Sequence, residues 1–185
     1  MKNKSVIAVI FILVLLLSAC GSAANKQTGE TAGEGGVEAT LVNYTSADQG
    51  FTIGHPATWT QDTSFTDGVK FVGGDDWMTL QFVLPSNGTD VMSYAKNDAT
   101  LLSKSFTGYQ QLNLAASTEV KNAVVLGFSA DGTSTITGKS FKAHNERYYI
   151  GQSDGRIAVL TVAGPDNHYD REGVRDIALT LKSGK

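Results

Sequence analysis

The 185-residue sequence predicts an α/β fold, a three-layer α/β/α sandwich with a mostly antiparallel central sheet. Short runs of alternating apolar and polar residues recur along the chain, as in strands with one exposed face. Two segments, which begin near residues 90 and 170, instead place apolar residues at helical spacing. The run IAVLTVAG at 157–164 is apolar at both sets of alternating positions, which indicates a central strand covered on both faces.

The N-terminal segment has the pattern of a signal peptide. Two lysines precede an unbroken apolar run at 6–17, which is shorter than the roughly 20 residues that a membrane-spanning helix needs. The run ends in a motif that resembles the bacterial lipobox and consists of Leu17, Ser18, Ala19, Cys20 and Gly21. The resemblance implies that residues 1–20 are a lipoprotein signal peptide and that Cys20 becomes the lipidated first residue of the mature protein.

Lipidation at Cys20 would place the protein at the cell membrane, facing outside, and we favour the outer face of the cytoplasmic membrane. Each buried CH₂ group contributes about 0.8 kcal/mol, so two or three acyl chains give a durable anchor. The alternative is that Cys20 is a buried thiol of a cytosolic domain, since free cysteine is common in cores. A cysteine-free remainder fits the oxidising environment outside the cell.

The composition argues against nucleic acid as a partner. The whole chain has a net charge of −3, and removal of residues 1–20 takes away two lysines and no acidic residue, which leaves 13 basic and 18 acidic residues and a net charge of −5. Residues 21–37, GSAANKQTGETAGEGGV, are small and polar, as in a flexible linker. Residues 38–185 are then a single domain, which we expect to be monomeric.

The first half of this domain is expected to begin with strands. A short strand at 50–54 is followed by Pro56, which ends it because proline cannot donate to a sheet. Two further strands at 68–72 and 77–84 flank the turn sequence GGDD. The alternation in the second of these runs predicts that one face packs in the core and the other does not.

A helix is expected next, followed by two more strands at about 109–119 and 123–130. Either Thr89 or Asp90 is placed to cap the start of this helix. The apolar residues that define its inner face are Val91, Ala95, Ala99, Leu102 and Phe106.

The second half ends in a long hairpin and a helix. The strands at 142–152 and 156–164 are joined at Asp154-Gly155, a strong hairpin signal. The last helix begins near Asp170. Its inner face is predicted to comprise Val174, Ile177, Ala178 and Leu181.

The stretch DQGFTIGHPATWTQ resembles the opening signature of PsbP-like domains, F-x-I-x-Y-P-x-x-W, through Phe51, Ile53, Pro56 and Trp59. The later run ERYYIGQSDGRIAVLTVAGP and the closing helix are similar to the same family, so that the resemblance covers most of residues 44–182. His55 departs from the pattern, which usually has Tyr. The resemblance implies a PsbP-like fold and a non-enzymatic binding or assembly domain. Independently of the family resemblance, large aromatic side chains are usually buried, so the aromatic residues of the signature are also expected in the core.

Catalytic motifs are absent from the sequence. It contains no Gly-x-Ser-x-Gly elbow, no His-Glu-x-x-His pair, no EF-hand loop and no dinucleotide-binding glycine motif. The adjacent carboxylates Asp75-Asp76 lie in a predicted turn, where they are expected to be solvated. The sequence therefore predicts that the protein is not an enzyme and needs no cofactor.

One end of the predicted sheet gathers metal-ligating residue types. If the hairpin turns at residues 154–155, residue 144 lies opposite 165, so four side chains emerge together: His144, Asp166, His168 and Asp170. The alternative assigns His144 to an exposed strand position, Asp166 to a turn and Asp170 to a helix cap, and we expect this alternative, without a tight metal site. With consecutive strands as neighbours, His55 and Asp75-Asp76 would lie about 15 Å apart, too far to share an ion.

Three classes of function stay open at this point. The leading prediction is a lipid-anchored protein that acts at the cell surface as a non-enzymatic protein-binding or assembly module. The alternatives are a carrier of a small ligand or metal, and an enzyme. A deep cleft with convergent polar groups would favour the alternatives, whereas an exposed aromatic surface would favour protein binding.

Overall fold

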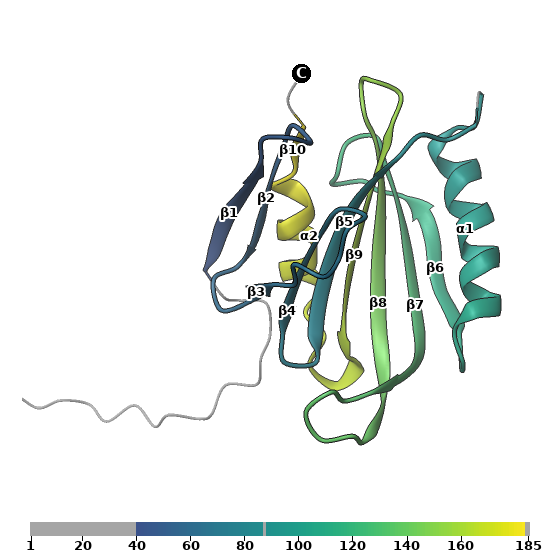
Figure 1. Cartoon of the computed structure of the whole chain (residues 1–185). Coiled ribbons are helices and arrows are strands. Elements are labelled where there is room, and N and C mark those ends of the chain that lie inside the picture. The colour runs from purple at the N-terminus through teal and green to yellow at the C-terminus, as the bar shows by residue number, and fades with distance from the viewer. Residues whose placement is uncertain (1–39, 87, 184–185) are drawn as a thin grey trace, which may run out of the picture. The chain divides into compact units, whose positions relative to one another are not determined.

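A seven-stranded sheet forms the middle of the domain in the computed structural model, which describes residues 40–86 and 88–183 (Figure 1). The predicted signal peptide, lipobox and linker lie outside these residues. The strands of this sheet are β3 (Thr60–Gln61), β4 (Val69–Gly73), β5 (Asp76–Val83), β6 (Gln110–Ala116), β7 (Ala123–Thr133), β8 (Ser140–Gly151) and β9 (Ile157–Pro165). Their order across the sheet is β3-β4-β5-β9-β8-β7-β6, and every neighbouring pair is antiparallel.

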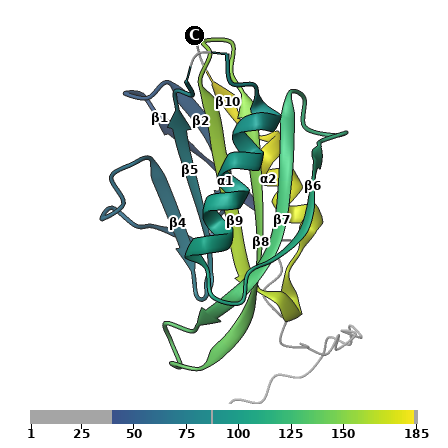
Figure 2. The same cartoon turned by 90° about the vertical axis from the view of Figure 1, so that its right-hand side faces the viewer.

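Helix α1 (Val91–Ser105) covers one face of the large sheet. It begins as predicted at Asp90, whose side chain accepts a hydrogen bond of 2.9 Å from the backbone nitrogen of Ser93. Figure 2 shows α1 on the near face of the sheet, with β4 to one side and β6 to the other. The core between α1 and the sheet combines buried residues of both: Ala95, Ala99 and Leu102 from the helix, and Val124, Leu126, Phe128, Ala130, Tyr149, Ile157 and Val159 from the strands.

The opposite face is covered by helix α2 (Arg171–Leu179) together with a second sheet (Figure 1). This small sheet has the order β1-β2-β10, formed by β1 (Leu41–Ser46), β2 (Phe51–Pro56) and β10 (Lys182–Ser183). The predicted inner face of the last helix is confirmed for Val174, Ile177 and Ala178, which are buried against the sheet. It is wrong for Leu181, which follows the end of α2 and is only partly buried against the same core. The predicted three layers and the antiparallel central sheet are therefore confirmed.

The predicted placement of the first strand is wrong. We expected residues 51–54 to pair with residues 68–72, but β2 pairs with β1 on one side and β10 on the other. Both edges of β2 are thus occupied within the small sheet. The backbone nitrogen of Gly54 also donates a 2.7 Å hydrogen bond to Thr180 just after α2, which ties the small sheet to that helix. The predicted 15 Å separation of His55 from Asp75-Asp76 assumed this pairing and therefore no longer follows. His55 instead stacks on Phe71, with the ring centroids 3.8 Å apart.

The hairpin and the family signature fold as local chemistry dictates. Gly155 has a φ of +84°, which suits glycine, and β9 is buried at every position, as expected for a strand covered on both faces. Within the signature, Phe51 and Ile53 are core residues and Pro56 is the last residue of β2. Trp59 packs closely over Gly73: a Cβ atom at this position would lie 2.2 Å from the indole ring, so no larger residue fits.

Candidate functional site

The predicted metal-ligating residues lie at one end of β8 and β9 and form two separate pairs. His144 lies opposite Gly164, one residue from the predicted register, and its Nδ1 is 3.4 Å from Asp166 Oδ1. The prediction of an exposed strand position for His144 is wrong, because the residue is buried and its ring stacks on that of Tyr169 with the centroids 4.0 Å apart. His168 Nε2 instead lies 3.4 Å from Asp76 Oδ2. Asp170 is the N-cap of α2 and accepts a hydrogen bond from the backbone of Glu172. Within the described ranges, no three His, Cys, Asp or Glu side chains form a group that could hold a metal ion.

Asp76 is a member of this end that sequence reasoning placed in a solvated turn. It is the first residue of β5, and because Trp77 pairs with Ala163, Asp76 lies beside Gly164. Burial raises the pKa of the Asp76 carboxyl, and the neighbouring His168 partly opposes this shift. Asp75 also has a structural partner, since its Oδ1 accepts a 3.0 Å hydrogen bond from the backbone nitrogen of Thr135. Both carboxylates therefore support the fold at this end of the sheet.

A cavity of about 310 Å³ opens on the α1 side of the sheet, and we call it the aromatic groove. Side chains from β4, β5, β7, β8 and the end of α1 line this cavity. The residues that line it are Lys70, Val72, Gly74, Asp75, Trp77, Phe106, Ala130, Asp131, Gly132, Thr133, Thr135, Phe141, Ala143 and Asn145. Three aromatic rings, from β5, the end of α1 and β8, thus meet around one opening.

The groove exists because α1 packs over one half of the sheet and leaves β4 and β5 beside it (Figure 2). Side chains alternate along a strand, so Met78 points into the core on the α2 side while Trp77 points to the α1 side, where it is half-buried. The loop between β7 and β8 closes the lower end through the hydrogen bond from Thr135 to Asp75. On this loop Ile136 is 72% exposed, an unusual position for a large apolar side chain.

Two ion pairs lie at the groove, and a further charged group, Asp75, is held by its hydrogen bond from Thr135. Lys70 Nζ lies 3.0 Å from Asp62 Oδ2, and Lys142 pairs with Asp131. Hydrogen bonds from Ser64 and then from Lys70 lower the pKa of Asp62 to about 2. The groove therefore presents an apolar floor with a rim whose charges largely compensate one another.

A buried polar network fixes α1 beside the groove. Asp98 on α1 accepts hydrogen bonds from Arg147 at 2.6 Å and from the Tyr149 hydroxyl at 2.7 Å, both on β8. Burial and this hydrogen bond to Asp98 raise the pKa of Tyr149. Hydrogen bonds to a charged group are stronger than neutral ones, so the network holds the helix at a defined distance from the sheet.

Sequence reasoning did not find the aromatic groove. Phe106 was assigned to the inner face of a helix, Trp77 to a strand, and Phe141 to no site at all. One signal was available: Trp77 alternates with Met78, Leu80 and Phe82, so it belongs to the face of its strand that those core residues leave free. A large aromatic side chain on that face indicates either a covering element or a binding surface.

Comparisons with known proteins show the fold. No family model matches the chain, and no curated protein matches it. Among solved structures, the Ran-binding protein Mog1p of Saccharomyces cerevisiae superposes with a TM-score of 0.57 at 8% identity, covering 79% of this chain and 96% of that chain. LpqN of Mycobacterium tuberculosis, which is involved in cell envelope biogenesis, gives 0.52 at 15% identity, with 79% and 91% covered. The domain thus has a Mog1/PsbP-like fold, as the signature predicted.

Proposed function

We propose that this chain is a lipid-anchored protein-binding module at the outer face of the cell membrane and that it binds a segment of a partner protein in the aromatic groove. The observation that carries the proposal is the set of half-buried rings of Trp77, Phe106 and Phe141 around one opening, with the exposed Ile136 next to the lining residue Thr135. Aromatic residues are enriched in the cores of protein interfaces and supply much of their binding energy. Binding without catalysis is the proposed activity.

The occupant that fits the groove is an apolar side chain, aliphatic or aromatic, presented by a partner protein. The rim ion pairs of Lys70 and Lys142 leave little net charge for an ionic ligand to recognise. The chain's own linker is a poor candidate, because residues 21–37 contain no aromatic residue and Val37 is their only large apolar residue. A partner in trans is therefore the occupant to which we commit.

Two structural neighbours support this proposal. Mog1p is a Ran-binding protein, so the fold is compatible with a protein partner. LpqN is involved in cell envelope biogenesis, which fits a role outside the cytoplasm. Together with the lipobox ending at Cys20, they favour an envelope protein that assembles with another protein.

The anchor is tested by Cys20→Ser in the expressing cell. The variant is expected to stay uncleaved by the lipoprotein signal peptidase and to take up no labelled fatty acid, because the serine hydroxyl cannot form the thioether to the lipid. Normal acyl labelling of the variant would refute the lipid anchor. The wild-type chain, expressed in the same cells, is the positive control and should take up the labelled fatty acid.

The partner is tested by photo-crosslinking on the cell surface. A photoreactive amino acid at position 136, on the rim, is expected to capture a partner, whereas the same residue in place of Leu179, which is exposed on α2, is not. Trp77→Ala should abolish the adduct from position 136, while the matched control Leu101→Ala, exposed on the outside of α1, should leave it unchanged. An adduct that survives Trp77→Ala, or capture from position 179 alone, would overturn the groove as the binding site.

A further inference from the structure

A buried carboxylate lies on the face of the sheet opposite the aromatic groove. Residues 144, 146 and 148 of β8 point to the α2 side because side chains alternate along a strand. Glu146 is only 3% exposed, although strand β9 beside it is apolar at almost every position. A glutamate is rarely buried to this extent without a partner, so its surroundings indicate why it is tolerated.

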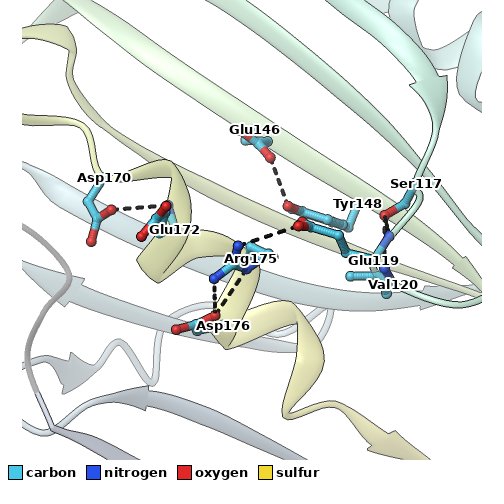
Figure 3. Close-up of polar contacts among 9 residues, drawn as sticks. All are labelled: Ser117, Glu119, Val120, Glu146, Tyr148, Asp170, Glu172, Arg175 and Asp176. Carbon is cyan, nitrogen blue, oxygen red and sulfur yellow. Dashed lines mark hydrogen bonds and ion pairs between the residues drawn. The ribbon is translucent and has the colours of Figure 1, made fainter.

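The carboxylate of Glu146 is incompletely paired. Its Oε1 accepts a 2.8 Å hydrogen bond from the hydroxyl of Tyr148 (Figure 3), whereas Oε2 is buried and has no hydrogen-bond partner among the residues that the structure describes. The nearest cation is Arg171, whose Nε lies 3.5 Å from Oε2 without forming a hydrogen bond and whose side chain is 62% exposed. An ionised carboxylate removed from water needs several donors, and here one oxygen lacks them.

Glu146 and Tyr148 line a second cavity of about 320 Å³, which we call the carboxylate groove. It lies between α2 and the edge of the sheet, where Asn113 and Val125 contribute from β6 and β7. On its α2 side, Arg175 is already engaged by Asp176 at 3.0 Å and by Glu119 at 3.4 Å (Figure 3). The contacts of Arg175 in the described residues are thus with Asp176 and Glu119 and not with Glu146.

A second tyrosine hydroxyl lies near the same carboxylate. The Tyr169 hydroxyl is buried beside Glu146, outside the set of residues that line the groove, and burial together with the charge of Glu146 raises the pKa of Tyr169. A species that carries only donors complements the second carboxylate oxygen of Glu146: an ammonium offers three N–H donors and a guanidinium five. A metal ion fits less well, because no group of three His, Cys, Asp or Glu side chains that could hold one forms in the described part of the chain.

We propose that the carboxylate groove binds a small organic cation with a primary ammonium or guanidinium group, with Glu146 as the anionic anchor and the Tyr148 hydroxyl holding its carboxylate in place. The cavity volume lies at the lower end of the range of small-molecule sites, about 300–1,000 Å³, which suits a molecule of few atoms. The site is separate from the aromatic groove, so the test of this ligand does not depend on the proposed protein partner.

Calorimetric titration of the full chain in detergent tests the site, with agmatine as the probe because it carries both cationic groups. Saturable binding is expected for agmatine, and none for tetramethylammonium, a cation that has no N–H donors. Glu146→Gln should weaken agmatine binding at least tenfold, since it removes the charge and keeps the shape. The matched control Glu172→Gln, on the rim of the same groove, should change the affinity less than threefold.

Two further results decide the outcome. If Glu146→Gln does not fold, Glu146→Asp keeps the charge but withdraws it by one methylene group, and it should weaken binding at least fivefold. Absence of saturable agmatine binding by the wild-type chain would mean that water alone occupies the groove, and would overturn the proposal. Equal affinity in the wild-type chain and in the Glu146 variant that folds would do the same.

Discussion

Removal of the Tyr148 hydroxyl tests the energetics of the buried carboxylate directly. In Tyr148→Phe, Glu146 Oε1 loses the 2.8 Å hydrogen bond that is its one close partner, while Oε2 already lacks one. Both residues are 3% exposed, so water cannot replace the hydroxyl without opening the structure. The substitution deletes one oxygen atom and leaves the ring in place, so its cost is chiefly electrostatic.

The expected cost follows from the chemistry of the pair. A hydrogen bond to a charged group contributes about 1.5–3 kcal/mol, and a buried charge left without partners loses the upper part of that range. The ion pair with Arg171 offsets little, because an exposed arginine is screened by solvent. We expect the free energy of unfolding to fall by about 2–3 kcal/mol in Tyr148→Phe, or by about 4–12 °C in melting temperature for a domain of this size.

A double-mutant cycle separates this effect from simple packing loss. Glu146→Met replaces the carboxylate by an apolar group of similar volume, and such replacements of buried charges are often neutral or stabilising. In the Glu146→Met background, Tyr148→Phe should lower the free energy of unfolding by less than about 1 kcal/mol, because the hydroxyl then has no carboxylate to which it can donate. Urea unfolding followed by circular dichroism measures all four proteins.

Tyr109→Phe is the matched control for the cycle. The hydroxyl of Tyr109 is also buried, but it has no hydrogen-bond partner, so its removal should leave stability unchanged or slightly raised. The reasoning is refuted if Tyr148→Phe costs no more than Tyr109→Phe, or if its cost is the same with and without the Glu146 carboxylate.

Three other predictions concern the domain boundary, the histidines and the acid response. A chain that starts at Gly36 should be soluble and monomeric and should melt cooperatively, since the first described strand begins at Leu41; an unfolded product would contradict the boundary. Zinc titration should show no binding at micromolar affinity or tighter, because His144 and His168 pair with different aspartates; tight binding that is lost in His144→Ala and His168→Ala would contradict this. Asp62→Asn should destabilise the domain at neutral pH, because the pKa of Asp62 is lowered to about 2 and its ionised form stabilises the fold above 3.8. The difference from the wild type should narrow as the pH falls from 3.8 towards 2, and a difference that stays constant across that window would show that Asp62 acts through something other than its charge.

The elements that could be predicted are those with a strong local pattern. Helix α1 has a capping Asp90 and a regular apolar stripe, and β9 is apolar on both faces, so each carries its own signal. Strands β1 and β10 could not be found in this way. Strand β1 is exposed at three of its six positions and β10 has two residues, and both are strands because β2 offers them an edge. Such pairing is set by tertiary structure and leaves little trace in the local sequence.

The candidate sites differ in the same way: residues that a single hairpin brings together could be predicted, and residues that distant strands bring together could not. His144 and Asp166 could be brought together from the sequence because one hairpin, with a recognisable turn, sets their register. Asp76 could not be assigned to the same end, since β5 and β9 are far apart in the chain and nothing local announces their pairing. The aromatic groove depends on the same non-local pairing, because Trp77 and Phe141 meet only when β5, β9 and β8 lie side by side.

Strand β8 supplies polar residues to both faces of the sheet, and the carboxylate that they meet is hydrogen-bonded more completely on the α1 side than on the α2 side. Residues 144–149, HNERYY, occupy a central position where the neighbouring β9 is almost entirely apolar, so each polar group there costs desolvation. On the α1 side, Arg147 and Tyr149 both donate to Asp98, and that carboxylate is well paired by its own fold. On the α2 side, Glu146 receives one close donor and faces a cavity with its second oxygen free. A sheet selected for stability alone would pair or remove the second carboxylate as it pairs the first, which is why Glu146 rather than Asp98 indicates a ligand.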